Sequence, residues 1–170
     1  MLVLGIDPGT AITGFALVGE AEQGPYLVEA GVLRTTVATP VGRRLQAIHR
    51  GVVELAQRYG PDAAAVEEIF FSRNVRTALA VGHARGVVLL ALADSGVPVY
   101  EYKPTQVKQT VTGYGAADKQ QIQEMVRLLL HLEHRLEPDD AADAAAIAMC
   151  HLQTAAFLRA VQGHSEAVSR

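Results

Sequence analysis

The chain has almost no cysteine: Cys150 is the only one among 170 residues. A single thiol excludes a disulfide scaffold and a zinc site built from clustered cysteines, and it favours a reducing compartment. Long hydrophobic runs are also lacking, because the longest uncharged apolar stretch, Ala144 to Phe157, is shorter than the ~20 residues of a membrane helix. The N-terminus shows neither the basic region nor the cleavage site of a signal peptide. We therefore expect a cytoplasmic protein without a membrane span.

An excess of positive charge is missing as well, since the formal net charge is -3. This balance argues mildly against a nucleic-acid partner, because phosphate binding usually leaves a basic footprint. The charges are segregated, however. Residues 73–119 carry six basic and three acidic side chains, whereas residues 118–143 carry seven acidic and three basic ones. Such a chain could hold a polyanion in one place and a metal in another, although ordinary solvated faces would produce the same pattern.

Linkers, internal repeats and low-complexity segments are absent from the sequence. An apolar fraction of 49% indicates a globular fold, and 170 residues are enough for one domain with a sizeable core. We expect a single domain over residues 1–160, followed by a polar, flexible tail over residues 161–170.

The hydrophobic pattern predicts an α/β fold with a mixed central sheet of five strands and helices on both faces. The predicted strands cover residues 2–7, 12–18, 26–33, 63–66 and 97–102. The predicted helices lie between Pro40 and Gly60 and over residues 76–93, 104–112, 118–131 and 139–160. The first three strands follow one another too closely for a crossover, whereas the later strands are separated by helices, which indicates a mixed sheet.

Four carboxylates stand where elements begin or end. Asp7 ends the first strand, Glu67 ends the fourth, and Asp140 and Asp143 lie three residues apart at the start of the last helix, on one face. Each has a plainer explanation as a turn former, a surface residue or a first-turn acid. Together they could converge on one pocket, where oxygen ligands favour Mg²⁺ or Mn²⁺ over zinc. Two such ions about 4 Å apart can clamp a phosphodiester for attack by water.

Four blocks of sequence resemble the RuvC family of bacterial Holliday-junction resolvases over residues 2 to about 155. The blocks are Gly5-Ile6-Asp7-Pro8-Gly9-Thr10, Ala65-Val66-Glu67-Glu68-Ile69-Phe70, Gln106-Val107-Lys108-Gln109 followed by Lys119, and Asp140-Ala141-Ala142-Asp143-Ala144. The resemblance implies an RNase H-like fold, a homodimer, and metal-dependent cutting of two opposing strands of four-way junction DNA in recombination and repair. It also implies the RuvA and RuvB branch-migration proteins as partners.

Carried over by position, the resemblance makes Asp7, Glu67, Asp140 and Asp143 the catalytic, metal-binding acids, with two Mg²⁺ or Mn²⁺ ions per site. Their neighbours Glu68 and Asp139 are expected to be bystanders, because a strand turns Glu68 to the other face and a helix turns Asp139 about 100° from Asp140.

The resemblance also implies roles for cationic and aromatic residues in DNA binding. Lys108 and Lys119, two of only three lysines, would lie near the scissile phosphate and stabilise negative charge. Phe70 would stack on an exposed base. Independently of the resemblance, Arg73 and Arg76 are candidates for contacts with backbone phosphates because they lie just beyond Phe70 in the chain. We expect Phe71, Cys150 and His151 to pack in the core, and the stretch Gly86 to Ala93 to contact the second subunit.

Other functions remain open at this point. The first block also resembles the phosphate loop of the actin, Hsp70 and sugar-kinase ATPases, which need two such domains around a nucleotide. A junction-binding module without catalysis would tolerate loss of the acids, yet all four are present. RNase H shares the fold, but its motif blocks are not found. A cleavage assay on a junction, a linear duplex and an RNA–DNA hybrid separates these possibilities.

Overall fold

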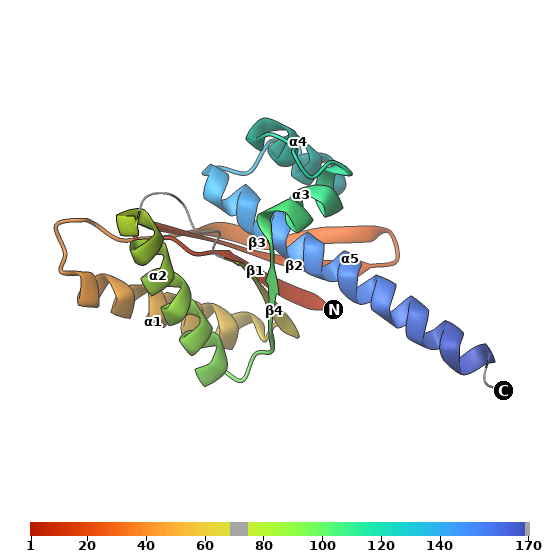
Figure 1. Cartoon of the computed structure of the whole chain (residues 1–170), viewed down its shortest axis with the longest axis horizontal. Coiled ribbons are helices and arrows are strands. Elements are labelled where there is room, and N and C mark those ends of the chain that lie inside the picture. The colour runs from red at the N-terminus through yellow and green to blue at the C-terminus, as the bar shows by residue number, and fades with distance from the viewer. Residues whose placement is uncertain (69–74, 169–170) are drawn as a thin grey trace.

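A mixed sheet of five strands forms the centre of the protein, as the sequence predicts (Figure 1). The computed structural model describes residues 1–68 and 75–168. The strands run in the order β3-β2-β1-β4-β5, where β1, β2 and β3 pair antiparallel and β4 pairs parallel with both β1 and β5. Their bounds are β1 Leu2–Asp7, β2 Ile12–Ala21, β3 Gly24–Arg34, β4 Ala63–Glu67 and β5 Val99–Tyr102.

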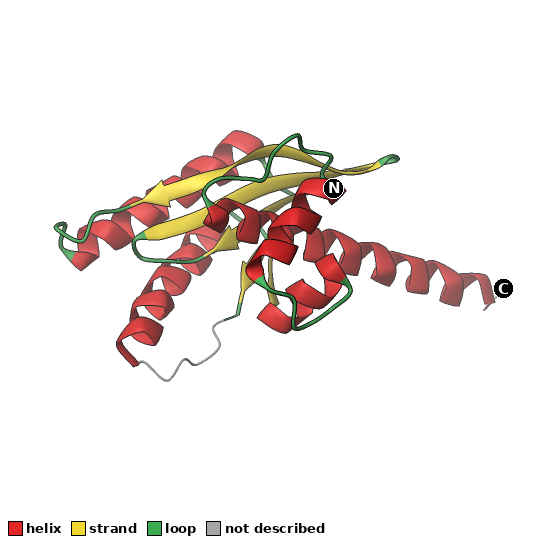
Figure 2. Cartoon of the chain, turned by 90° about the horizontal axis from the view of Figure 1, so that it is seen from above, coloured by secondary structure: helices red, strands yellow, loops and turns green. Residues whose placement is uncertain are grey.

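In the described part of the chain, five helices cover the two faces of this sheet (Figures 1 and 2). Their bounds are α1 Val41–Tyr59, α2 Val75–Asp94, α3 Pro104–Thr112, α4 Lys119–Leu129 and α5 Asp139–Val168. Helices α1 and α2 pack on one face, and α3, α4 and α5 lie on the other. The predicted α/β architecture with helices on both faces is thereby confirmed.

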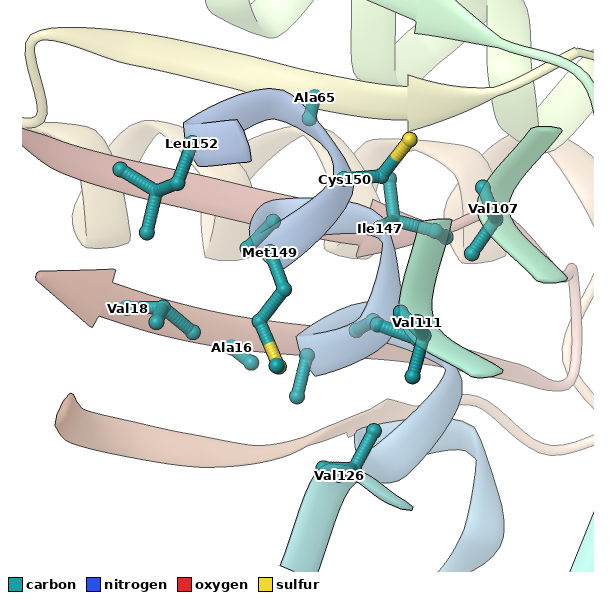
Figure 3. Close-up of a cluster of buried hydrophobic side chains, with 14 of the residues drawn as sticks. Ala16, Val18, Ala65, Val107, Val111, Val126, Ile147, Met149, Cys150 and Leu152 are labelled. Carbon is teal, nitrogen blue, oxygen red and sulfur yellow. The ribbon is translucent and has the colours of Figure 1, made fainter. Parts of the chain in front are cut away.

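Each face of the sheet has its own hydrophobic core because successive strand residues point to opposite sides. In β1, Val3 belongs to the core under α5, whereas Leu4 belongs to the core over α1 and α2. Figure 3 shows the α5 side, where Ile147 and Met149 of α5 lie between the strands and the helices α3 and α4. Cys150 and His151 are buried there, as expected.

Two glycines let α5 lie directly on the strands. A Cβ atom on Gly5 of β1 would overlap the carbonyl oxygen of Ala144, and one on Gly14 of β2 would overlap the carbonyl oxygen of Asp140. Only residues without a side chain allow so close an approach of a helix backbone. Because Gly14 pairs with Asp7 in the sheet, this contact holds the first turn of α5 beside the end of β1.

Helix α5 is longer than the sequence pattern suggested. The pattern predicts an end near Ala160, but α5 continues to Val168 and extends beyond the sheet (Figure 2). Within the described residues, its segment Asp139–Gln162 has the length and hydropathy of a membrane helix, yet half of its most apolar window is buried inside the protein. Packing on the sheet therefore accounts for its apolar composition without a bilayer.

The start of α4 is fixed by its cap. Asp118 accepts a hydrogen bond from the backbone N–H of Gln121, and the side chain of Gln121 accepts one from the backbone N–H of Asp118. This reciprocal arrangement satisfies two N–H groups at the helix start. Lys119, the first residue of α4, is thus set in a defined position next to the start of α5.

Candidate active site

A cavity of about 200 Å³ lies at the carboxyl ends of β1 and β4, against α3, α4 and α5. The charged side chains that line it are Asp7, Glu67, Lys108, Lys119 and Asp143. The remaining lining residues are Pro104, Val107, Ile122, Ala146 and Ile147. The cavity thus combines a polar, charged part with an apolar wall, and five of the residues predicted from sequence meet in it.

The sheet brings the first two acids together. Strands β1 and β4 are parallel neighbours with Ile6 paired to Val66, so Asp7 and Glu67 end adjacent strands at the same edge. The third acid comes from α5, whose first turns rest on Gly5 and Gly14. Three segments distant in sequence therefore supply one carboxylate each to the same cavity.

Burial and mutual repulsion change the acidity of these groups. Burial, followed by the charges of Asp143 and Asp140, raises the pKa of Asp7 to about 6. Burial, followed by the charges of Asp7 and Asp143, raises the pKa of Glu67 to about 7. Burial also raises the pKa of Asp143 above its usual range, although Lys119 opposes this effect. Carboxylates crowded in this way gain stability from any cation that enters.

Asp140 lies close enough to influence this cluster but stands apart from the cavity wall. Its charge contributes to the raised pKa values of Asp7 and Asp143. Its backbone rests on Gly14, the partner of Asp7 in the sheet. Asp140 is therefore beside the cavity, and its role as a fourth acid stays a prediction.

The two lysines are held by different partners. Lys108 of α3 donates a hydrogen bond to the carbonyl oxygen of Ala117 at 2.9 Å, which ties α3 to the loop before α4. Lys119 contacts two carboxylates of α5, with its Nζ 2.6 Å from Asp139 and 3.1 Å from Asp143. These contacts raise the pKa of Lys119 and lower that of Asp139, so both groups are charged at neutral pH.

Asp139, expected to be a bystander, forms an ion pair with Lys119 but does not line the cavity. Asp139 turns away from Asp140, but it is four residues from Asp143 and shares a helix face with that residue. This spacing places both carboxylates within reach of the Lys119 ammonium once α4 packs beside the start of α5. Glu67 lines the cavity and Glu68 is not among its lining residues, so the bystander role of Glu68 stays a prediction.

Three of the predicted DNA-binding residues cannot be placed in the cavity. Phe70 and Arg73 lie outside the described residues, as does Phe71. Arg76 belongs to α2, and its side chain is not among those described. Their predicted contacts with DNA stay predictions.

The acids provide the ligand chemistry of a hard divalent cation, because each offers carboxylate oxygen and the described lining of the cavity contains no cysteine or histidine. Within residues 1–68 and 75–168, no three His, Cys, Asp or Glu side chains are arranged to enclose an ion. The Lys119 ammonium lies 3.1 Å from one oxygen of Asp143. The donor set fits a metal, which would share the Asp143 carboxylate with Lys119 or displace the ammonium.

A five-stranded mixed sheet with carboxylates at two strand ends and at the start of the covering helix defines an RNase H-like nuclease. The profile of the family described as crossover junction endodeoxyribonuclease RuvC matches residues 3–151. The chain belongs to this family. Enzymes of the family depend on divalent metal ions.

Individual relatives agree with this assignment. The chain is 56% identical to the crossover junction endodeoxyribonuclease RuvC of Chloroflexus aggregans over 159 residues, which cover 94% of this chain and 97% of the relative. The corresponding enzyme of Roseiflexus sp. is 53% identical, with coverage of 94% and 95%. The structure of Thermus thermophilus RuvC in complex with a Holliday junction substrate superposes with a TM-score of 0.86 at 42% identity, covering 91% of this chain and 94% of that one.

A more distant structure shares the fold alone. The yeast mitochondrial Holliday junction resolvase superposes with a TM-score of 0.68 at 14% identity, covering 98% of this chain and 85% of that one. The predicted family, fold class and enzyme class are confirmed by the nearer matches, which decide against the ATPase and the non-catalytic module.

Proposed function

We propose that this chain resolves four-way DNA junctions by hydrolysing one phosphodiester bond in each of two opposing strands. The observation that carries the proposal is the convergence of Asp7, Glu67 and Asp143 with Lys108 and Lys119 on one cavity. It is supported by the relative from Thermus thermophilus, whose structure contains a Holliday junction substrate.

Two Mg²⁺ or Mn²⁺ ions would be held by four acids, namely Asp7, Glu67, Asp140 and Asp143. When bound, such ions polarise the phosphodiester and make a water molecule more nucleophilic. The chain supplies the setting. Val107 and Ile147 form part of an apolar wall beside the acids, and burial raises the pKa values of Asp7 and Glu67, so a bound cation would stabilise their charged forms.

The lysines serve a different purpose from the acids. A cation at the cavity wall stabilises the negative charge that develops on the phosphate during the reaction. Lys108 is fixed by one hydrogen bond to Ala117 and has further protons to donate. Lys119 neutralises Asp143 and can turn toward a phosphate while remaining close to the acids.

Phe70, Arg73 and Arg76 follow Glu67 in the chain, and we assign them to junction recognition. Phe70 would stack on an unpaired base, a contact worth roughly 1–3 kcal/mol, and the arginines would contact phosphates. The Phe70→Ala variant should then lose cleavage of intact junctions more than it loses overall affinity. Equal losses of both quantities would contradict the stacking role.

The working unit is a homodimer in this proposal, because one cavity can cut one strand and resolution requires two symmetric cuts. The proposed contact is the exposed side of α2. The stretch Gly86 to Ala93 has a buried and an exposed side. Val88, Ala91 and Leu92 are buried in the core, whereas Leu90 is exposed and available for the contact between subunits. Sedimentation at micromolar concentration should give twice the chain mass, and mixed dimers with one Asp7→Asn subunit should nick one strand only.

The cellular setting follows from the same proposal. Membership of the RuvC family supports the RuvA and RuvB branch-migration proteins as the proposed partners. A DNA substrate and a single buried thiol favour the cytoplasm as the location.

The direct test compares three labelled substrates with Mg²⁺ present: a four-way junction, a linear duplex and an RNA–DNA hybrid. The proposal predicts paired, symmetric nicks in the junction and little cutting of the other two. Preferential cutting of the hybrid, or equal cutting of all three, would overturn junction resolution as the function.

A further inference from the structure

One stretch of the chain is basic but was not recognised from the charge pattern. Between Ala30 and Val53 the sequence has four arginines and no aspartate or glutamate. In a chain with net charge -3 this local excess is unusual. Three of these arginines, Arg34, Arg43 and Arg44, lie at the end of β3 and in the first turn of α1, and we call them the arginine shoulder.

The sheet topology places the arginine shoulder at the same edge as the cavity. Strand β3 runs parallel to β1, with β2 between them, because both neighbouring pairs are antiparallel. Asp7 pairs with Gly14 near the start of β2, and Arg34 pairs with Ile12 two residues nearer that start. Two strand spacings of about 4.8 Å separate β3 from β1. Arg34 therefore emerges beyond the edge at which Asp7 ends β1.

Hydrogen bonds connect the shoulder to the loop that follows Asp7. Arg44 donates from Nε to the hydroxyl of Thr35 at 2.8 Å. Thr35 in turn donates from its hydroxyl to the carbonyl oxygen of Thr10, and from its backbone N–H to that of Ala11 at 2.9 Å. This chain of contacts fixes the Arg44 guanidinium against the loop that leaves β1, three residues after Asp7.

The charges of the shoulder are available to a ligand. Arg34 and Arg43 are exposed, and Arg44 is half-buried. In the described part of the chain, none of the three forms an ion pair with a carboxylate. Arg43 donates to the neutral side chain of Gln46 at 3.0 Å. The matched contrast is Arg58 at the other end of α1, which lies 4.0 Å from Glu29.

The position of these charges is unfavourable for the protein alone. Helix α1 begins without a side-chain cap and without an acid in its first turn, so its N-terminal N–H groups and two arginines put positive charge in one place. Cations at a helix N-terminus oppose the helix dipole. An anion beside this surface would relieve that repulsion.

We propose that the arginine shoulder binds the phosphate backbone of a duplex arm of the DNA on the β3 side of the cavity. The inference rests on the proposed junction-resolving function, which it deepens by assigning a binding surface. The acids of the cavity repel phosphates, so DNA needs cationic contacts nearby that do not belong to the cutting machinery. Backbone contacts of this kind set register and carry no sequence information.

The test measures junction binding by fluorescence anisotropy over a series of KCl concentrations, in EDTA so that no cutting occurs. Each lost phosphate contact lowers the slope of log affinity against log salt by about 0.9. The variant Arg34→Gln/Arg43→Gln/Arg44→Gln should therefore lose about one to three units of slope and at least tenfold in affinity near 100 mM salt. Arg58→Gln should match the wild type in both quantities.

Two further variants keep the outcome interpretable. The double variant Arg34→Gln/Arg43→Gln leaves the Arg44–Thr35 hydrogen bond intact and should still reduce the salt slope. The variant Arg44→Lys keeps the positive charge and should therefore keep the wild-type salt slope. With Mg²⁺ and saturating junction, the triple variant should cut within about threefold of the wild-type rate. An unchanged salt slope in both multiple variants overturns the inference and leaves the cutting site untouched. A wild type that fails to cut the junction overturns the proposed function instead.

Discussion

The Nζ atom of Lys119 lies 3.1 Å from an oxygen of Asp143, inside the cavity that also holds Asp7 and Glu67. The same ammonium group lies 2.6 Å from Asp139, which is outside the cavity wall. Lys119 thus supplies positive charge to a cluster of acids that repel one another. A metal ion that binds Asp143 must displace or share this contact, and Asp139 can keep Lys119 nearby when that happens.

Lys119→Met should slow cutting strongly, because a charge that stabilises the reacting phosphate is lost. Losses of this kind are on the order of 10²–10³ in rate. Junction affinity should fall only modestly. The measurement is the single-turnover cleavage rate at saturating junction, compared with affinity in EDTA. A variant that loses affinity and rate in equal proportion would assign Lys119 to binding.

Asp139→Asn should slow cutting by roughly two- to fivefold, the range for a partly exposed ion pair, and should not abolish it. Since Asp139 acts through Lys119, its substitution should have no further effect in the Lys119→Met background. Glu137→Gln, which removes the same charge from the preceding loop, is the matched control and should cut normally. An equal effect of Asp139→Asn in both backgrounds would show that Asp139 acts independently of Lys119.

The pKa of Glu67, raised from 4.5 to about 7, predicts that this residue destabilises the metal-free protein increasingly as the pH rises through this range, with the full cost above about pH 7. An acid whose pKa is higher in the folded than in the unfolded state costs stability once the pH exceeds the unfolded value. Glu67→Gln should therefore stabilise the metal-free protein by on the order of 1–3 kcal/mol at pH 8. The gain should shrink as the pH falls toward 5.

Thermal unfolding of the two proteins in EDTA at several pH values checks this dependence. Comparing the variant with the wild type cancels the contribution of groups that do not interact with Glu67, such as buried His151, whose pKa is lowered by burial. The same difference in stability at pH 5 and pH 8 would show that folding does not raise the pKa of Glu67.

Gly14→Ala should move the first turn of α5 away from β2, because the new methyl group overlaps the carbonyl oxygen of Asp140. Overpacking of this kind costs roughly 1–3 kcal/mol. The variant should also cut more slowly at a temperature where it is fully folded, since Asp140 and Asp143 shift from Asp7. Gly42→Ala in α1, where a Cβ meets open space, is the control. Normal cutting by folded Gly14→Ala would contradict the positioning role.

The elements and the acids were predictable because each has a local signal. Strand β1 is an apolar run that ends at Asp7-Pro8-Gly9, and Asp140 and Asp143 open a helix at a spacing that puts them on one face. The resemblance to a family then joined these separate signals into one site. No local pattern could have shown that Lys119 spans to Asp139, because this contact depends on how the starts of α4 and α5 meet.

The close approach of α5 to the sheet and the arginine shoulder were missed for a related reason. In the sequence, Gly14 looks only like a residue that weakens a strand. In the structure, the carbonyl oxygen of Asp140 packs directly against it, which leaves no room for a side chain. Arg34 and Arg44 belong to a segment with no carboxylate, but their nearness to Asp7 follows from strand pairing and from Thr35. Such relationships are set by tertiary packing, which sequence periodicity does not encode.

The most direct test of the account is cleavage of a four-way junction by Asp7→Asn in the presence of Mg²⁺, with binding measured on the same preparation. The account predicts no cutting in Mg²⁺ and, in EDTA, junction affinity equal to or above that of the wild type, because without bound metal the removal of a negative charge near phosphates cannot weaken their attraction. Glu68→Gln, whose side chain does not line the cavity, should cut normally. Cutting by Asp7→Asn at a near wild-type rate would contradict the assignment of the acids as the metal-dependent cutting site.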